Sequence, residues 1–505
     1  MIDSKSEWFN ETNVVFQQVL DQVALNLNEI HSVHYSTRFW NIFVGPWLQR
    51  FVNMVMLRMY EIKNNVEVPV TTISYQPASS LVEFAERMKT SEFVESLHAE
   101  VLVQLNSLKG SSGIERRFKD EQSNQKQHRI LGRIYISTTY LPRLMEVLLQ
   151  LRLGRLPQKL RVSQISYTTF NTQIRDLLRK SNQSMASGTE VTLALLPKYL
   201  PCVYVEGFES LFDTSKPWKS ERFPKVIFTA NRHLYDDVFN FWTALAVEGG
   251  GQLVLAQHGG NYGISEFPSF AENHENLAAD RYITWGWDSS GTTYKGFALP
   301  LVGRTSHSPN PKGSLLVITD QLWKYPRSIF SDTSESSTYL DHLTSTINGL
   351  HSDIRPDVLL RIHHAHQDAG SSQTDWWKLH APDIKQDMEG IGFQKRLAES
   401  RLVLIAHNGT SIPESIALHA PTIITWSDSY MKVRQSAEPV FNALEQVGIF
   451  HRTPESAASF INSIWDDVDG WWNSPTTIDA RKQFTDQYAR SVSNPVRFLA
   501  KALQF

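Results

Sequence analysis

The sequence has a single cysteine, Cys202, among its 505 residues. One cysteine excludes an intramolecular disulfide and any zinc or iron–sulfur site built on several cysteine ligands. The chain also lacks a basic excess, since 49 Lys and Arg stand against 52 Asp and Glu, for a net charge of −3. Proteins whose main partner is nucleic acid usually carry such an excess, so we expect no nucleic-acid partner.

Long hydrophobic runs are also absent. The most apolar stretch, residues 40–60, contains Arg50, Arg58 and Pro46, and it falls short of the roughly 20 apolar residues that span a bilayer. The first residues lack the basic and apolar regions of a secretory signal. These features predict a cytoplasmic protein and leave open a peripheral association with the inner face of the cell membrane.

The remaining composition is that of a globular protein, with 41% apolar and 20% charged residues. A chain of this length is too long for one hydrophobic core, so we expect several domains. In the first part, apolar residues recur at helical spacing, which predicts a helical N-terminal region. The expected helices lie within residues 14–62, 78–107, 138–153 and 168–181.

Further along, short apolar runs alternate with helical segments, a pattern typical of parallel sheets covered on both faces. The expected strands are 191–197, 225–230, 252–257, 281–287, 314–319, 357–363, 401–407 and 421–426. Three prolines and a glycine in 300–312 indicate a junction. The fold class we predict is α/β, with two Rossmann-like domains facing a cleft (GT-B-like). The predicted units are an N-terminal α/β domain with the helical region (1–300), a C-terminal α/β domain (301–476) and a C-terminal helix (477–505) broken at Pro495.

Two adjacent carboxylates follow the strand expected at 225–230. Asp236 and Asp237 stand where a helix would begin, so either can cap that helix by accepting its first N–H groups. A capping role for one leaves the other for chemistry. Both are therefore candidate catalytic residues.

A glycine-rich loop, QHGGNYG at 257–263, follows the next expected strand. Its three glycines let the backbone approach a ligand closely. His258 can exchange a proton near neutral pH, and Glu275, beside His274, can act as a general base. His258 and the His274–Glu275 pair can instead have structural roles. The candidates here are the catalytic His258 and Glu275 and the acceptor-side loop residues Gln257, Gly259, Gly260 and Tyr262.

In the second half, polar residues follow two expected strands. The turn Asn-Gly-Thr-Ser at 408–411 opens an expected helix, whose N–H groups and hydroxyls suit a phosphate unless they only cap the helix. The three histidines near the other strand, at 363, 364 and 366, do not share one face, which argues against zinc. The candidate donor-binding residues are Arg361, His363, His364, Asn408, Gly409, Thr410 and Ser411, and no metal ligand is predicted.

The order of these motifs resembles one family. The segment from Ser36 to Trp40, the QHGG loop, His274-Glu275, TWGW at 284–287 and WDDVDGWWNSP at 465–475 resemble transferases encoded in bacterial surface-polysaccharide gene clusters. That family is distantly similar to the retaining transferases of Kdo, an acidic eight-carbon sugar. The resemblance implies two Rossmann-like domains, a donor held mainly by the second, an acceptor held mainly by the first, and no obligatory metal.

The same resemblance implies a glycosyltransferase of capsule, O-antigen or lipopolysaccharide biosynthesis. Its donor would be a CMP-sugar such as CMP-Kdo, a substrate rather than a cofactor, and its acceptor a glycan or lipid-linked glycan. Retention of configuration implies a carboxylate nucleophile, Asp236 or Asp237. His258 or Glu275 would activate the acceptor hydroxyl or stabilise the departing phosphate. His364 stands where related enzymes have the proline of a His-Pro pair, which weakens that nucleotide contact.

Two other functions stay open. Polyol-phosphate transfer from a CDP-linked donor, as in teichoic-acid polymerases, would need a dense basic cluster that the predicted loops lack. A carbohydrate-binding protein without activity would not need ionisable residues at the strand ends. Turnover with several donors distinguishes these alternatives.

Overall fold

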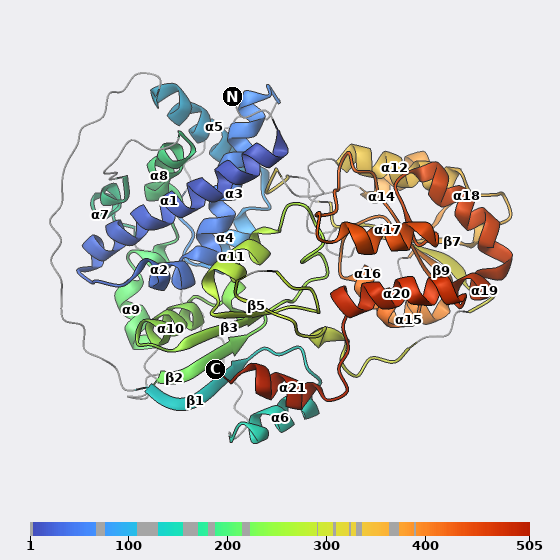
Figure 1. The fold of residues 1–505 in the computed structure, drawn as a ribbon. Coiled ribbons are helices and arrows are strands. Elements are labelled where there is room, and N and C mark those ends of the chain that lie inside the picture. The colour runs from blue at the N-terminus through green and yellow to red at the C-terminus, as the bar shows by residue number, and fades with distance from the viewer. Residues whose placement is uncertain are drawn as a thin grey trace.

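The computed structural model describes residues 4–66, 76–108, 130–154, 170–179, 187–214, 223–289, 291–306, 310–322, 325–329, 336–362, 373–387 and 390–504. The chain forms two lobes, each built on a parallel sheet, with the N-terminal helices stacked on the first lobe (Figure 1). The predicted α/β class, with two parallel sheets and a helical N-terminal region, is therefore confirmed.

A layer of helices covers one face of the first sheet. In chain order it contains α1 (Lys5–His31), α2 (Thr37–Phe43), α3 (Gly45–Lys63), α4 (Leu81–Arg87), α5 (Ser91–Leu108), α7 (Thr172–Asp176), α8 (Ser187–Tyr199) and α9 (Phe208–Thr214). A capping box between Ser4 and Glu7 fixes the start of α1. Most of α3 is buried, which accounts for the apolar stretch noted at 40–60.

The first sheet has the strand order β1-β2-β3-β4-β5, all parallel. Its strands are β1 (Ile130–Ser137), β2 (Phe223–Thr229), β3 (Gln252–Ala256), β4 (Arg281–Ile283) and β5 (Thr293–Tyr294), and its helices are α6 (Arg143–Arg152), α10 (Asp237–Glu248) and α11 (Phe270–Ala278). Successive residues of one strand point to opposite faces. Ile227 packs toward the helical layer, whereas Val226 and Phe228 pack toward α6.

The second sheet has the order β11-β10-β9-β6-β7-β8, again all parallel. Its strands are β6 (Ser314–Ile318), β7 (Val358–Arg361), β8 (Lys385–Gln386), β9 (Ser400–Ile405), β10 (Thr422–Thr425) and β11 (Phe450–His451). Its helices are α12 (Ser336–Asn348), α14 (Gln373–His380), α15 (Phe393–Glu399), α16 (Ser411–Ala417), α17 (Glu438–Gln446), α18 (Pro454–Ile464), α19 (Val468–Trp472) and α20 (Pro475–Tyr488). The strand order reverses between β6 and β9, and sheets of this kind bind ligands at the carboxyl ends beside such a reversal.

The structure corrects two expectations in the first lobe. Residues 191–197, expected as a strand, lie inside α8, where Val191 and Leu195 are buried. A helix buried on several sides shows the same continuous apolar pattern as a buried strand. The edge strand β1 was not expected, because Gly132 and Arg133 interrupt its apolar run.

The C-terminal segment returns to the first lobe. It was expected as one long helix broken at Pro495, but it forms two separate helices: α20 ends at Tyr488, and α21 (Pro495–Ala502) begins at Pro495. Figure 1 shows α21 beside α6, on the face of the first sheet opposite the helical layer. Between the two helices, the Arg490 N–H donates to the Trp285 carbonyl, which ties the end of α20 to the first lobe.

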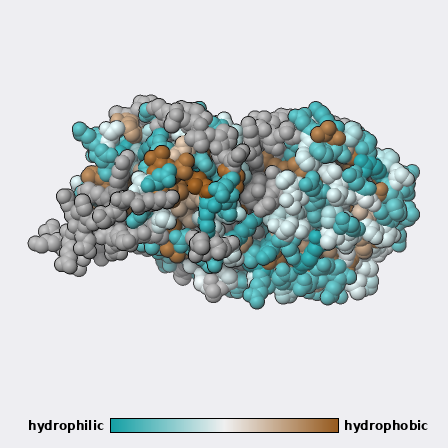
Figure 2. Space-filling view, turned by 90° about the horizontal axis from the view of Figure 1, so that it is seen from above, coloured by the Kyte–Doolittle hydropathy of each residue, from teal (hydrophilic) through white to brown (hydrophobic). Residues whose placement is uncertain are grey.

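The two lobes differ in surface character. Seen from above, apolar side chains gather on the helical layer, whereas the second lobe is mostly hydrophilic (Figure 2). A groove of about 410 Å³ in that layer is lined by Trp8, Met56, Met59 and Leu102, among others. No helix in the described ranges is both long and apolar enough to cross a membrane.

Candidate functional site

The two predicted loops meet at the carboxyl ends of the two sheets. The Gly260 N–H donates to Thr410 Oγ1 over 3.1 Å. A Cβ added at Gly260 would lie 2.6 Å from the Thr410 Cα, so only glycine permits this approach. The QHGG loop of the first lobe therefore packs directly on the turn at 408–411 of the second lobe.

Behind this contact, two histidines converge on one carboxylate. His258 follows β3, His233 lies in the turn after β2, and Glu275 comes from α11. Glu275 Oε1 lies 3.3 Å from His258 Nδ1 and 2.9 Å from His233 Nε2. Glu275 has no exposed side-chain surface, whereas 19% of the His258 side chain is exposed. His258 is thus the accessible member of a cluster whose carboxylate is shielded from water.

Burial sets the protonation of this cluster. It raises the pKa of Glu275 to about 8 and lowers the pKa of His233 to about 3. It also lowers the pKa of His258, which the nearby Glu275 partly opposes. At neutral pH the carboxyl is protonated and both imidazoles are neutral. An acid and an imidazole held this close can exchange a proton with a bound hydroxyl group.

Two phenols lie near the His258–Glu275 cluster. His258 Nε2 lies 3.2 Å from the Tyr262 hydroxyl. From the turn after β1, the Tyr140 hydroxyl accepts a hydrogen bond from the Asn231 amide. Tyr140 has a φ of 58°, in the left-handed region that costs a non-glycine residue free energy. Strained residues of this kind cluster at functional sites, and this one is 42% exposed at the carboxyl edge of the sheet.

Gln257 fixes the shape of the glycine-rich loop. Its side-chain oxygen accepts hydrogen bonds from the Trp285 N–H and the Trp287 indole, both at 2.8 Å. Its amide donates to the Gly259 carbonyl at 2.7 Å. Gln257 is buried, so it joins the QHGG and TWGW motifs and acts on bound molecules only through the loop that it holds.

Asp236 and Asp237 have internal partners. Asp236 caps α10 by accepting the Phe239 N–H, and it forms a buried ion pair with Arg232 at 2.7 Å. Asp237 accepts from the Tyr204 hydroxyl and the Leu81 N–H, and burial raises its pKa to about 6. These contacts favour structural roles for both residues, and the nucleophile assignment stays a prediction.

The second lobe contributes polar groups from the ends of β6 and β9, where the strand order reverses. His407 Nε2 lies 3.2 Å from Ser411 Oγ, and His407 Nδ1 lies 3.8 Å from Asp320 Oδ1. Asn408 is buried, and its side-chain oxygen has no hydrogen-bond partner within the described ranges. Thr410, the residue before α16, makes no side-chain cap. Its hydroxyl oxygen accepts from the first lobe, so Thr410 is not a simple cap, and its role as a donor-binding residue stays a prediction.

The other predicted donor-binding residues lie on and after β7. Arg361 pairs with Asp387 at 2.7 Å, and Arg396 pairs with the same carboxylate. Burial works against the charged form of Asp387, but hydrogen bonds from both arginines outweigh it and lower the pKa. The charge of Arg361 is therefore already partly balanced. His363 and His364 lie outside the described residues.

Several residues of the site were not singled out as site residues from the sequence. His233 and Asn231 lie in the segment from which only Asp236 and Asp237 were selected as candidates. Tyr140 lies in the range 138–153, where a helix was expected. Asp320 follows an expected strand, and that position was the available signal. His274, in contrast, is buried with its Nε2 3.0 Å from the Asn41 carbonyl. It positions α11 rather than facing the site.

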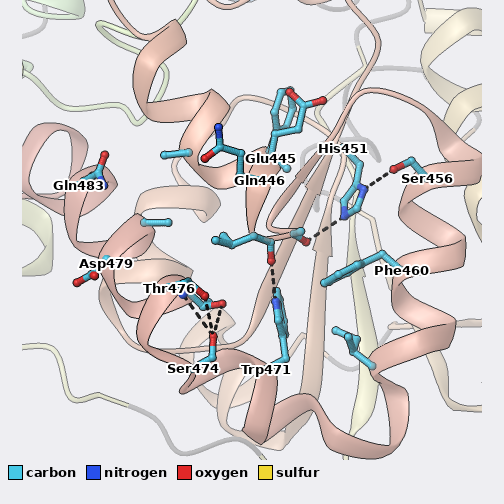
Figure 3. Close-up of a pocket in the computed structure, with 17 residues that line it drawn as sticks. Glu445, Gln446, His451, Ser456, Phe460, Trp471, Ser474, Thr476, Asp479 and Gln483 are labelled. Carbon is cyan, nitrogen blue, oxygen red and sulfur yellow. Dashed lines mark hydrogen bonds between the residues drawn. The ribbon is translucent and has the colours of Figure 1, made fainter.

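Other concavities lie away from these groups. One of about 760 Å³ sits at the amino end of β11, between α17, α18 and α20 (Figure 3). Its polar side chains mostly bond internally, as His451 does to Ser456 and Gly448, and Trp471 to the Val447 carbonyl. Within the described ranges, no three His, Cys, Asp or Glu side chains are arranged to hold a metal ion.

Comparison with known proteins identifies the family. The model for LIC12162 family transferases matches residues 3–130 and 99–503, and the chain therefore belongs to this family. No curated protein matches it.

Solved structures give distant similarity only. A protein from Listeria monocytogenes, assigned as a UDP-N-acetylglucosamine 2-epimerase, is 9% identical, with a TM-score of 0.34 over 57% of this chain and 74% of that one. The spinosyn rhamnosyltransferase SpnG, in complex with spinosyn aglycone, is 12% identical, with a TM-score of 0.31 over 59% of this chain and 77% of that one. At such TM-scores, neither similarity says which activity this chain has.

Proposed function

We propose that this member of the transferase family is a glycosyltransferase, which moves a sugar from a nucleotide-activated donor to a hydroxyl group of a glycan acceptor. The observation that carries the proposal is the meeting of two parallel sheets at their carboxyl ends, with the His258–Glu275 pair on one side. Asp320, His407 and Asn408 lie on the other side, beside the reversal of strand order. A donor would bind on that second side, and the acceptor beside His258.

The proton transfer rests on the distance between the two groups. His258 Nδ1 lies 3.3 Å from Glu275 Oε1, so an ionised Glu275 would favour a charged His258, and His258 Nε2 would take the proton of the acceptor hydroxyl. The acceptor would replace Tyr262 as the partner of Nε2. Glu275 then stabilises the imidazolium that forms. Because burial raises the Glu275 pKa to about 8, the basic form of the pair grows as the pH rises toward that value.

The donor we propose first is a CMP-sugar carrying an acidic sugar such as Kdo, transferred with retention to a capsule or lipopolysaccharide glycan. Its support is the resemblance of the QHGG, His-Glu and TWGW motifs to transferases of surface-polysaccharide loci. The reaction as proposed needs no cofactor beyond the donor substrate. The enzyme would work in the cytoplasm, where nucleotide sugars are made.

Thermal unfolding with separate nucleotides tests this proposal. The panel is CMP, CDP, UMP, UDP and GDP, with a sample without nucleotide as the control. A ligand at about 100 times its dissociation constant stabilises the native state by roughly 2.7 kcal/mol, which raises the transition by a degree or more. A shift with CMP alone supports the proposed donor, whereas a shift with UDP or GDP alone contradicts it but keeps sugar transfer. A shift with CDP alone favours polyol-phosphate transfer, and no shift with any nucleotide contradicts the proposed function.

A further inference from the structure

A stripe of leucines on α6 faces solvent. Leu144 is 70% exposed, Leu148 47% and Leu151 52%, and their spacing places them on one side of the helix. The opposite side already packs the helix onto the protein, because Leu149 is fully buried in a cluster that includes Leu499 of α21. The stripe is therefore not needed to hold α6 in place. Contiguous exposed apolar surface of this kind marks an interaction site.

Basic residues flank this stripe on its own helix and are also exposed on the adjacent one. Arg143 and Arg152, the first and last residues of α6, are both exposed. The adjacent helix α21 has exposed Arg497 and Lys501 and no acidic residue. The one carboxylate of α6, Glu146, accepts a hydrogen bond from Thr139 at 2.9 Å. The surface thus combines exposed leucines with an excess of positive charge.

We propose that α6 docks the first lobe on an anionic lipid bilayer, with its leucines among the upper acyl chains and its arginines at the headgroups. Helices with one apolar face and flanking basic residues bind the membrane interface in this way. A second copy of the chain is a poorer occupant. In a two-fold dimer, this surface would meet its own image, and the arginines and the lysine would repel one another.

The position of α6 relates this surface to the site. The helix begins three residues after Tyr140, and Pro142 lies against the loop at Gly303, where a Cβ would be 3.3 Å from its ring. A bilayer along α6, which is about 15 Å long, would thus lie near the acceptor side of the site. The acceptor class is then a lipid-linked glycan; that step rests on the proposed function, whereas the docking itself does not.

Vesicle binding without nucleotide tests the docking separately. Full-length protein is sedimented with vesicles of phosphatidylethanolamine and phosphatidylglycerol, and with vesicles of phosphatidylcholine alone. We expect binding to the anionic vesicles that weakens as salt is added. The double variant Leu144→Gln and Leu148→Gln should bind at least about tenfold more weakly. The double variant Arg143→Gln and Arg152→Gln should bind the anionic vesicles more weakly, by about fivefold for each arginine removed. Its binding to the phosphatidylcholine vesicles should not change.

The matched control is Leu379→Gln, which changes a leucine of 76% exposure on α14 of the second lobe. It should bind vesicles as the wild type does. All variants alter exposed side chains, so their unfolding temperatures should stay close to that of the wild type. Three results would overturn the docking: no binding of the wild type to anionic vesicles, unchanged binding of the leucine variant, or a wild-type dimer in sedimentation equilibrium that the leucine variant abolishes. A negative result in the vesicle test would not change the outcome of the nucleotide test, and a negative nucleotide test would not change the outcome of the vesicle test.

Discussion

Replacing Gly260 with alanine should separate the two lobes at the point where their loops touch. The added Cβ would lie 2.6 Å from the Thr410 Cα and 2.9 Å from the Gly409 carbonyl oxygen. Both neighbours are backbone atoms, so no side-chain rotation relieves the contact. Reaching an ordinary separation of at least 3.4 Å requires a movement of about 0.8 Å.

The expected size of the effect follows from this overlap. Overpacking of this kind costs typically about 1–3 kcal/mol, and weakening the Gly260–Thr410 hydrogen bond adds about 0.5–1.5 kcal/mol. If the lobes relieve the strain by opening, the loss of stability is smaller, but a misplacement near 1 Å can lower turnover by roughly 100-fold. We therefore expect a large loss of donor turnover with a fall in unfolding temperature of a few degrees.

The assay compares this variant with Gly392→Ala, which changes an exposed glycine of the second lobe. A Cβ at Gly392 would have no heavy atom within 4 Å, and the φ of −60° at this position suits alanine. That variant should keep both its turnover and its unfolding temperature. If Gly260→Ala matches Gly392→Ala in both measurements, then the loops do not meet as described, and the placement of the site between the lobes is wrong.

Three further predictions concern the surroundings of the site. Asp236→Asn breaks the buried pair with Arg232 and should cost about 3–5 kcal/mol of unfolding free energy; an unchanged unfolding free energy would contradict the structural role of this pair. Loss of turnover by the folded variant would identify Asp236, rather than Asp237, as the nucleophile. Arg434→Gln removes the ion pair to buried Glu272, at 2.8 Å across the lobes, and should cost about 1.5–3 kcal/mol in denaturant unfolding; an unchanged midpoint would contradict the role of this pair. Four histidines have pKa values that burial lowers to about 3 or 4: His31, His233, His274 and His342. They outnumber the three acids whose pKa values burial raises, Asp237, Glu272 and Glu275. The unfolding free energy should therefore fall as the pH drops from 6.5 to about 4.5, where the unfolded chain takes up more protons than the fold. Urea unfolding at pH 6.5 and 4.5 checks this, and equal stability at both would contradict it.

The sequence predicted the sheets better than the helical layer. In an open parallel sheet, a strand is a short apolar run between turn residues, and most runs of this kind after residue 220 proved to be strands. The same signal misassigned 191–197, because a buried helix is also apolar along its whole length. It missed β1, where Gly132 and Arg133 interrupt the run.

For the site, the sequence predicted which loops form it better than it predicted the role of each residue. Because the carboxyl ends of parallel strands share one edge, the turn at 408–411 and the QHGG loop were both expected to face the cleft, and they touch there. Residue type alone did not show that Asp236 forms a buried ion pair with Arg232, which lies four residues earlier. Nor did it show that His233 shares a carboxylate with His258. Such assignments depend on which neighbour the tertiary fold supplies.

The most direct test of the proposed chemistry measures the turnover of the His258→Asn variant. The donor is the sugar derivative of the nucleotide that stabilises the protein in the thermal-unfolding panel. The control is His419→Asn, which changes an exposed histidine on the second lobe whose φ of 64° asparagine tolerates. A positioned general base contributes typically about 100- to 10,000-fold, so His258→Asn should lose at least about 100-fold in turnover while it stays folded and still binds the nucleotide. The control should match the wild type, whose rate should rise with pH toward the Glu275 pKa of about 8. A folded His258→Asn enzyme that turns over the donor as fast as the control would contradict the account.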